Sequence, residues 1–204
     1  MSVGTVFLVD DDAAIRDALA WLLRTRGIAS RTFASAEALL ADYSADWAGM
    51  LVLDIRMDGM SGSALFDELR ARGCRLPVIF LTGHGDVPLA VNALKGGAFD
   101  FIEKPFNDNE LVDRIASALE IDAARRQREA GDAGTSARLA TLTEREREVM
   151  QRILAGKLNK VIADELDIAM RTVEVHRARI FAKMGVRSAV ELARRLAADG
   201  PGSA

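Results

Sequence analysis

Short apolar runs alternate with amphipathic segments from residue 5 to residue 121 of this 204-residue chain. Between the first two runs, Ile15, Leu19 and Leu22 recur at the spacing of one helix face. The runs are apolar at consecutive positions, which is typical of strands that are buried on both faces of a parallel sheet. Five strand–helix repeats predict an α/β unit, a (βα)5 doubly wound parallel sheet covered by helices on both sides. The predicted strands span residues 5–9, 28–33, 50–53, 78–81 and 99–102.

Capping signals separate the predicted helices from the strands. Ser35 and Ser61 each precede an amphipathic segment and are expected to be N-caps. Asn107 with Glu110 forms a capping box that opens the last helix of this unit. These signals agree with the alternation and support the same fold.

The alternation stops near Asp122. Residues 123–129 are highly charged and could continue the last helix, whereas residues 130–136 are small and polar, a composition typical of linkers. Helical periodicity resumes at a capping box formed by Thr143 and Glu146, and three more helical patterns follow. A frayed tail is expected at 199–204. The predicted parts are an α/β unit at 3–121, a linker and partly helical extension at 122–140, and an all-α four-helix unit at 141–198.

Charge and composition narrow the classes of function. Residues 1–121 hold 18 acidic and 11 basic side chains and the remainder hold 12 and 16, so the two parts carry −7 and +4. This asymmetry mildly favours a nucleic-acid partner for the second part, although a chance imbalance would look the same. No run of 18 apolar residues and no secretory signal pattern occurs, so we expect a cytoplasmic protein with no membrane partner.

Cysteine and histidine are scarce. The single Cys74 fits a reducing compartment, because it cannot form a disulfide within the chain. Beside it stand only His84 and His176, far apart in the sequence, so a zinc site is not expected.

Carboxylates gather where two predicted strands end. Asp10, Asp11 and Asp12 follow the first strand, and Asp54 ends the third. Ligands of open parallel sheets bind beyond the carboxyl ends of the strands, where the strand order reverses. If the two strands are neighbours, the crowded negative charges favour a hard cation with oxygen ligands, such as Mg²⁺. Asp12 by itself is expected to be a turn residue or a helix N-cap.

Two other strand ends carry complementary groups. Thr82 offers a hydroxyl donor after the fourth strand, and Lys104 offers a positive charge able to meet phosphate oxygens after the fifth. Either residue alone would be unremarkable at a strand end. Their joint placement with the carboxylates predicts a site that handles phosphate.

Residues 3–121 resemble the receiver domain of two-component response regulators, because Asp10-Asp11, Asp54, Thr82 and Lys104-Pro105 occur in that family's order and spacing. The resemblance implies strand order 2-1-3-4-5 and phosphorylation of Asp54 by a sensor histidine kinase. Lys104 would contact the phosphoryl group. Thr82 would form a switch pair with Phe101, whose inward turn alters the surface of the fourth helix, fifth strand and fifth helix.

The same resemblance implies a Mg²⁺ site. Its ligands would be Asp11, Asp54 and the backbone carbonyl of Arg56, with Asp10 helping through a water molecule. The Lys104-Pro105 peptide bond is expected to be cis, which X-Pro bonds allow at modest cost. One departure is Asp58, which stands where the family often has proline; we expect a change in loop stiffness but no lost chemical group.

Residues 141–198 resemble the LuxR/GerE-type helix-turn-helix DNA-binding domain through the segments 142–149, 159–163 and 171–177. With the receiver, this is similar to the FixJ/NarL family of response regulators, and closest to its FixJ branch. The implied function is transcription regulation by a protein that forms a homodimer on phosphorylation and binds double-stranded DNA. RNA polymerase is a further partner expected from the family.

The third helix of this second unit has two distinct faces at 100° per residue. Val173, Ile180 and Met184 share an inner face with His176, which is expected to be a packed structural residue. Arginines on the outer face suit phosphate or guanine, a glutamate suits cytosine, and a valine suits the thymine methyl group. The predicted DNA-contacting residues are Lys160, Arg171, Glu174, Val175, Arg177, Ala178 and Arg179.

The turn before this helix departs from the family. Asp167 stands where glycine is usual, and Ala169 stands where a capping serine is usual. Loss of such a cap costs about 1 kcal/mol, so we expect a weakened helix start without loss of DNA binding.

Two other classes of function are weighed against this hypothesis. A phosphohydrolase that uses an aspartyl-phosphate needs an acid–base carboxylate two residues after the nucleophile, and that position holds Arg56. We therefore expect slow self-dephosphorylation but no enzyme. RNA binding is disfavoured because aromatic residues make up 5% of the chain and only Phe181 lies in the second part.

Overall fold

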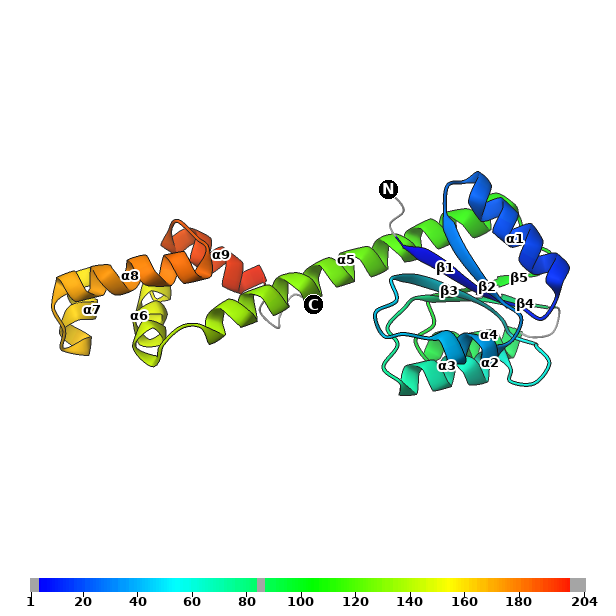
Figure 1. Ribbon diagram of the computed structural model, residues 1–204, viewed down its shortest axis with the longest axis horizontal. Coiled ribbons are helices and arrows are strands. Elements are labelled where there is room, and N and C mark those ends of the chain that lie inside the picture. The colour runs from blue at the N-terminus through cyan, green and yellow to red at the C-terminus, as the bar shows by residue number, and fades with distance from the viewer. Residues whose placement is uncertain (1–3, 84–86, 199–204) are drawn as a thin grey trace. The chain divides into compact units, whose positions relative to one another are not determined.

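The computed structural model describes residues 4–83 and 87–198, which form two compact units, Met1–Arg125 and Arg126–Ala204 (Figure 1). Residue 3, His84 and the tail 199–204, on which expectations were placed, lie outside the described residues. None of the described helices is both long and apolar enough to cross a lipid bilayer.

The first unit is a parallel five-stranded sheet of order β2-β1-β3-β4-β5, as predicted. The strands are β1 (Thr5–Val9), β2 (Ala29–Phe33), β3 (Gly49–Asp54), β4 (Val78–Thr82) and β5 (Asp100–Glu103). The helices are α1 (Ala13–Thr25), α2 (Ala36–Asp42), α3 (Gly62–Ala71), α4 (Val87–Lys95) and α5 (Asp108–Ala140). Ser35 and Ser61 cap α2 and α3, because their hydroxyl oxygens accept the N–H groups of Ala38 and Ala64.

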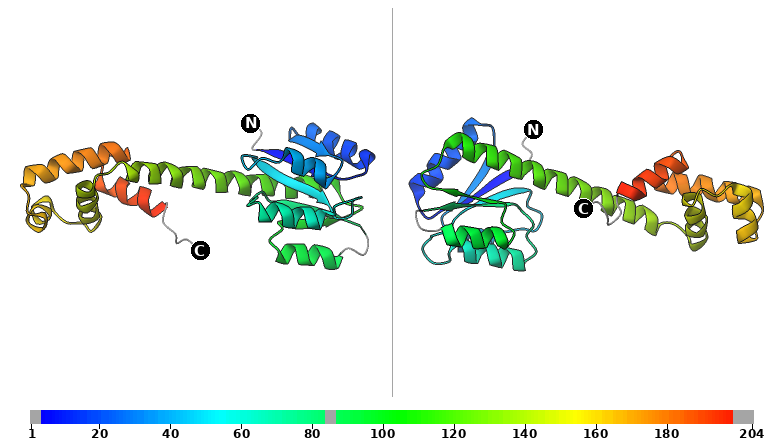
Figure 2. Two further views of the ribbon diagram at one scale, coloured as in Figure 1. Left: turned by 60° about the horizontal axis from the view of Figure 1, so that its bottom comes forward. Right: turned by 180° about the vertical axis from the view of Figure 1, so that it is seen from behind.

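The sheet separates two apolar cores, one on each face. α2, α3 and α4 cover one face, and α1 and α5 cover the other (Figures 1 and 2). β3 is buried at every position because both layers contact it. All strands run the same way, so the carboxyl ends of β1, β3, β4 and β5 reach one edge of the sheet.

α5 continues through the whole segment from residue 122 to residue 140, so the linker-type composition of residues 130–136 does not interrupt the helix. Gly131 and Gly134 are each about 1 kcal/mol less favourable than alanine inside a helix. The end of the helix is nevertheless held by the second unit. Thr135 is buried there, and Arg138 donates to the carbonyl oxygen of Met184 at 2.9 Å. Such tertiary contacts outweigh local composition.

The second unit packs α6 (Glu144–Leu154), α7 (Asn159–Leu166), α8 (Met170–Met184) and α9 (Ala189–Ala198) around one apolar core, as predicted for a four-helix unit. The predicted capping box at Thr143 and Glu146 is confirmed in both directions. Asp167 ends α7 in the left-handed conformation at φ 51°, and Ala169 begins α8 without a side-chain cap. Asp167 therefore adopts a conformation that favours glycine, and α8 begins without the bond that a capping serine could make.

Candidate functional sites

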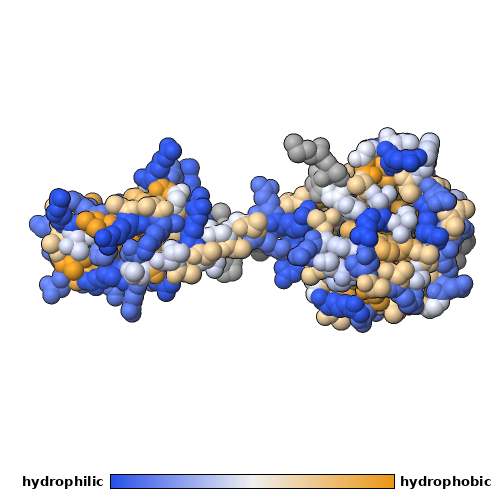
Figure 3. Space-filling view, viewed as in Figure 1, coloured by the Kyte–Doolittle hydropathy of each residue, from blue (hydrophilic) through white to orange (hydrophobic). Residues whose placement is uncertain are grey.

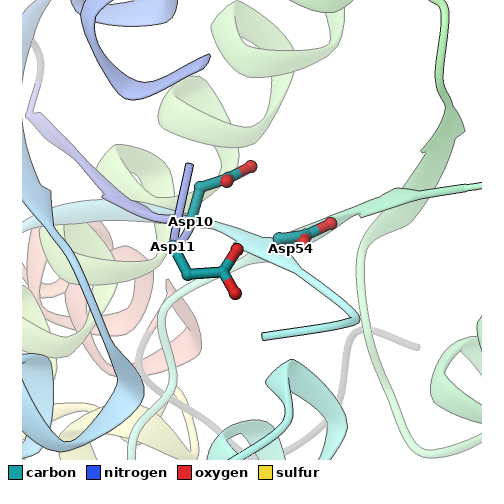
Figure 4. A group of neighbouring side chains, drawn as sticks. All are labelled: Asp10, Asp11 and Asp54. Carbon is teal, nitrogen blue, oxygen red and sulfur yellow. The ribbon is translucent and has the colours of Figure 1, made fainter. Parts of the chain in front are cut away.

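The acidic residues converge at the carboxyl edge of the sheet. Asp10 directly follows β1 and Asp54 ends β3, and these two strands are neighbours. One carboxylate oxygen from each of Asp10, Asp11 and Asp54 lies within 4.8 Å of the other two, and the three side chains project in the same general direction (Figure 4). Asp10 is 1% exposed and Asp54 is 8% exposed, whereas Asp11 lies at the surface.

Lys104 bridges two of these carboxylates. It follows β5, and its Nζ donates to Asp10 Oδ2 and to Asp54 Oδ1, each at 3.0 Å. The peptide bond from Lys104 to Pro105 is cis, as expected. The structure thus brings together the four charged side chains that the sequence predicted at this site.

The pKa values of Asp54 and Lys104 are both raised. For Asp54, burial is the largest cause, and the charges of Asp10 and Asp11 add to it, so together they outweigh the opposing effect of Lys104. For Lys104, burial alone would lower the pKa, but its bonds to Asp10 and Asp54 and their charges prevail. The lysine is therefore held as a cation, whereas the aspartate is a carboxylate kept in an unfavourable environment.

Thr82 and Phe101 lie on the same face of neighbouring strands. Phe80 pairs with Phe101, and Thr82 lies two residues beyond Phe80, so its side chain has the same facing. Thr82 is fully buried, and its hydroxyl has no hydrogen-bond partner among the described residues. Phe101 is partly buried against the core under α2, α3 and α4. A buried hydroxyl with no bond is costly, so the site favours an added acceptor at this position.

The loop between β3 and α3 borders the site, because the N–H of Asp58 donates to Asp11 Oδ2 at 2.9 Å. Arg56 lies on this loop with an exposed side chain. Asp12 is the N-cap of α1, as predicted, because its carboxylate accepts the N–H of Ala14 at 2.8 Å. Sequence reasoning missed Gly62, where an added Cβ would lie 2.0 Å from the carbonyl oxygen of Asp54. Only glycine fits this close approach. A single sequence gives no sign that the two backbone segments lie so close together.

The donor set of this site fits Mg²⁺. The three converging side chains offer only carboxylate oxygens, which are hard ligands, and two of them are held in place by the sheet. Neither sulfur nor imidazole is among these three ligands, so the arrangement does not favour a softer metal.

α8 has the two faces that its sequence predicts. Val173, Ile180 and Met184 are fully buried, and His176 is partly buried with no described partner for its Nδ1 atom. Figure 3 shows a largely hydrophilic visible surface on this unit, interrupted by smaller apolar areas. The exposed residues of the predicted DNA-contacting set on α8 are Arg171, Glu174, Val175, Ala178 and Arg179.

Two members of the predicted set lie in different surroundings. Arg177 is half-buried, and its guanidinium lies 5.4 Å from the ring centroid of Phe181 on the same helix. Lys160 is exposed in the first turn of α7, whose N-cap residue, Leu158, makes no side-chain cap bond. Uncapped N–H groups and a lysine at a helix start favour a phosphate contact.

An α/β unit with a carboxylate and lysine site, joined to a helix-turn-helix unit, defines a class of signal-controlled DNA-binding proteins. Residues 6–116 match the response regulator receiver domain family, and residues 140–196 match the luxR family of bacterial regulatory proteins. The chain belongs to the two-component response regulators of the LuxR/FixJ type.

Individual relatives agree with this assignment. The chain is 54% identical over 192 residues to the C4-dicarboxylate transport transcriptional regulatory protein DctR of Rhodobacter capsulatus, covering 93% of this chain and 98% of that protein. It is 47% identical over 203 residues to the transcriptional regulatory protein FixJ of Rhizobium meliloti (strain 1021), covering 99% of each. Both relatives are transcriptional regulatory proteins, which confirms the expectation that the chain is a regulator of transcription.

Solved structures match the chain over both of its units. The response regulator StyR has a TM-score of 0.88 at 42% identity, covering 95% of this chain and 98% of that chain. Full-length FixJ from B. japonicum has a TM-score of 0.61 at 41% identity, covering all of both chains. The fold prediction is therefore confirmed for both units.

Proposed function

We propose that Asp54 accepts a phosphoryl group from a sensor histidine kinase and that this modification controls DNA binding by α8. The carboxylate of Asp54 carries the proposal, because it shares one site with Asp10, Asp11 and Lys104. Asp54 is 8% exposed, so a phosphoryl donor can reach it from solvent.

The chemistry is a single displacement at phosphorus. A carboxylate oxygen of Asp54 forms the new P–O bond while the P–N bond to the donor's imidazole breaks, and the imidazole keeps the electron pair. Mg²⁺, held by Asp11, Asp54 and the carbonyl of Arg56 with Asp10 acting through water, would supply positive charge beside the transferring group. Lys104 lies 3.0 Å from Asp54 and can turn to a phosphoryl oxygen.

The buried hydroxyl of Thr82 would respond to the phosphoryl group on Asp54. Phosphorylation adds about −1.5 to −2 units of charge and three acceptor oxygens at the end of β3. Thr82, which has no described partner, gains one by donating to such an oxygen. Its movement leaves room for Phe101 to turn inward, which changes the surface formed by α4, β5 and α5. We propose that this changed surface forms the homodimer.

The exposed face of α8 is the proposed DNA surface, placed in the major groove. Arg171 and Arg179 would meet phosphate or guanine, Glu174 would accept from cytosine, and Val175 would contact a thymine methyl group. Ala178 allows close approach, Arg177 adds positive charge beside Phe181, and Lys160 on α7 would contact phosphate. A dimer would read two related half-sites, recruit RNA polymerase and act in the cytoplasm.

The acceptor is tested by comparing Asp54→Asn with Asp12→Asn, a matched control at the exposed cap of α1, where asparagine also caps. Each full-length protein is treated with an acyl phosphate and Mg²⁺, and phosphorylation is followed by mass spectrometry. We expect labelling of wild type and Asp12→Asn, with higher mass in solution and tighter DNA binding, and none for Asp54→Asn. Labelling of Asp54→Asn, or an unchanged oligomeric state and DNA affinity in labelled wild type, would contradict the proposal.

The DNA surface is tested with Arg179→Ala and, as a matched control, Arg194→Ala, an exposed arginine on α9. Loss of one good base contact costs about 1–3 kcal/mol of binding free energy, and loss of a phosphate contact lowers the salt dependence instead. We expect either effect for Arg179→Ala in fluorescence anisotropy and neither for Arg194→Ala. Equal effects of both substitutions would point to general positive charge and not to α8.

A further inference from the structure

The loop between β3 and α3 is tied to the acidic site by its own backbone. The N–H of Asp58 donates to Asp11 Oδ2 at 2.9 Å. Proline has no N–H, so this bond depends on a residue other than proline at position 58. The departure from the family's usual proline therefore adds a hydrogen-bond donor to the site.

Two other backbone N–H groups of the loop donate to residues outside the acidic cluster. The N–H of Met60 donates to Glu37 Oε1 of α2 at 3.1 Å, and the N–H of Gly62 donates to the carbonyl oxygen of Ile55 at 3.0 Å. These bonds hold the second half of the loop against α2 and the end of β3. The bond from Asp58 links its first half to Asp11.

Asp11 needs such a link more than the two buried aspartates do. Asp10 is held by the N–H of Asp12 and by Lys104, and Asp54 is held by Lys104. Asp11 is exposed, so its carboxylate would otherwise rotate freely at an entropic cost when a cation binds. A carboxylate has about four lone-pair positions, and one bond to Oδ2 leaves the others available.

We propose that Asp58 is a positioning residue of the magnesium site, whose backbone N–H orients Asp11 for the cation. This inference rests on the proposed Mg²⁺ site. The three carboxylates already converge within 4.8 Å while the bond is made, so the bond is compatible with the arrangement that a cation needs. The side chain of Asp58 is exposed, and solvent screens its charge, so the backbone donor and not the carboxylate carries the effect.

The test separates the donor from the charge. Asp58→Pro removes both, whereas Asp58→Ala and Asp58→Asn remove the charge and keep the N–H. Mg²⁺ alone is titrated into each full-length protein by isothermal calorimetry, with thermal unfolding as a check of folding. Loss of a group that orients a metal ligand weakens metal binding about 10–100-fold, and for an exposed ligand we expect about 10-fold for Asp58→Pro. Asp58→Ala and Asp58→Asn should bind like the wild type.

Two results of the titration would overturn the role of Asp58. One is an affinity for Mg²⁺ equal to or tighter than that of the wild type in a folded Asp58→Pro protein. The other is equal weakening of Mg²⁺ binding in all three variants. Absence of Mg²⁺ binding by the wild type would instead remove the magnesium site itself, and this inference with it. A second measurement needs no variant to fold. In NMR spectra of the wild type, the amide proton of Asp58 should exchange slowly and shift when Mg²⁺ is added; exchange at the rate of a free amide would also overturn the inference.

Discussion

Replacing Glu146 with glutamine should destabilise the second unit without affecting the first. Glu146 is 3% exposed, and its Oε2 accepts the N–H of Thr143 at 2.8 Å and the Nζ of Lys183 at 2.7 Å. The pair joins the start of α6 to the end of α8. The substitution keeps the shape of the side chain and one possible acceptor but removes the charge that Lys183 meets.

The expected loss follows from the exposure of the pair. A hydrogen bond to a charged group contributes about 1.5–3 kcal/mol to stability. The side chain of Lys183 is 33% exposed, so solvent partly replaces its partner, and we expect about 1.5–2 kcal/mol for Glu146→Gln. For a domain of this size, that corresponds to a fall in Tm of about 10 °C.

The two units can be followed separately by optical methods. Both tryptophans, Trp21 and Trp47, lie in the first unit, so tryptophan fluorescence reports on it alone. Circular dichroism at a helical wavelength also reports on the all-helical second unit. In urea or thermal unfolding, Glu146→Gln should shift the dichroism transition and leave the fluorescence transition unchanged.

A double-mutant cycle isolates the pair. We expect Glu146→Gln and Lys183→Met to be non-additive by about 1–2 kcal/mol. Lys183 holds the pKa of Glu146 below its ordinary value of 4.5, with the N–H of Thr143 adding to the effect against burial. This stability is therefore present above pH 4.5 and is lost as the pH falls through the lower pKa of the folded state. Additivity within about 0.5 kcal/mol, or a shift in tryptophan fluorescence, would refute the reasoning.

Four further predictions concern three single residues. Because burial raises the pKa of Asp54, labelling by an acyl phosphate should slow on acidification at a higher pH than for an ordinary aspartate. The charged form is unfavourable in the fold, so Asp54→Asn should raise Tm at neutral pH and lose this advantage as the pH falls; an unchanged Tm would contradict the burial argument. Asp122 is fully buried and accepts the N–H of Gly49 at 3.0 Å, so Asp122→Ala should cost about 2–4 kcal/mol, seen in tryptophan fluorescence. Ala169→Ser should stabilise the second unit by about 0.5–2 kcal/mol in circular dichroism, and no gain would mean that position 169 does not act as a cap.

Most of the fold was predictable because burial leaves a regular trace in the sequence. The consecutive apolar residues of β3 reflect contact with both helical layers, and the period of α8 separates Val173 and Ile180 from its exposed arginines. Strand ends differ from prediction by about one residue, as in β5, where exposed or half-buried positions give no clear signal.

Contacts between distant residues were not predictable in the same way. Spacing nominates Lys104 for a phosphate site, but the bridge from Asp10 to Asp54 depends on side-chain conformations that spacing does not describe. At position 58 the sequence shows only that proline is absent. The structure shows that the N–H of Asp58, which proline would not have, donates to Asp11. The helical course of residues 130–136 has the same origin, because the buried Thr135 acts through tertiary packing.

α5 takes part in two cores and crosses a stretch that belongs to neither. Leu111 and Ile115 are buried in the first core and Leu139 packs against the last, but no side chain from residue 126 to residue 134 is buried. A helix segment of this length has marginal stability by itself, and two glycines lower it further. Its amide hydrogens should therefore exchange with deuterium long before those around Ile115, and trypsin should cut first at its arginines and release two folded fragments. The helix is therefore continuous in geometry, but its least stable turns lie between the part that packs in the first core and the part that packs against the last core.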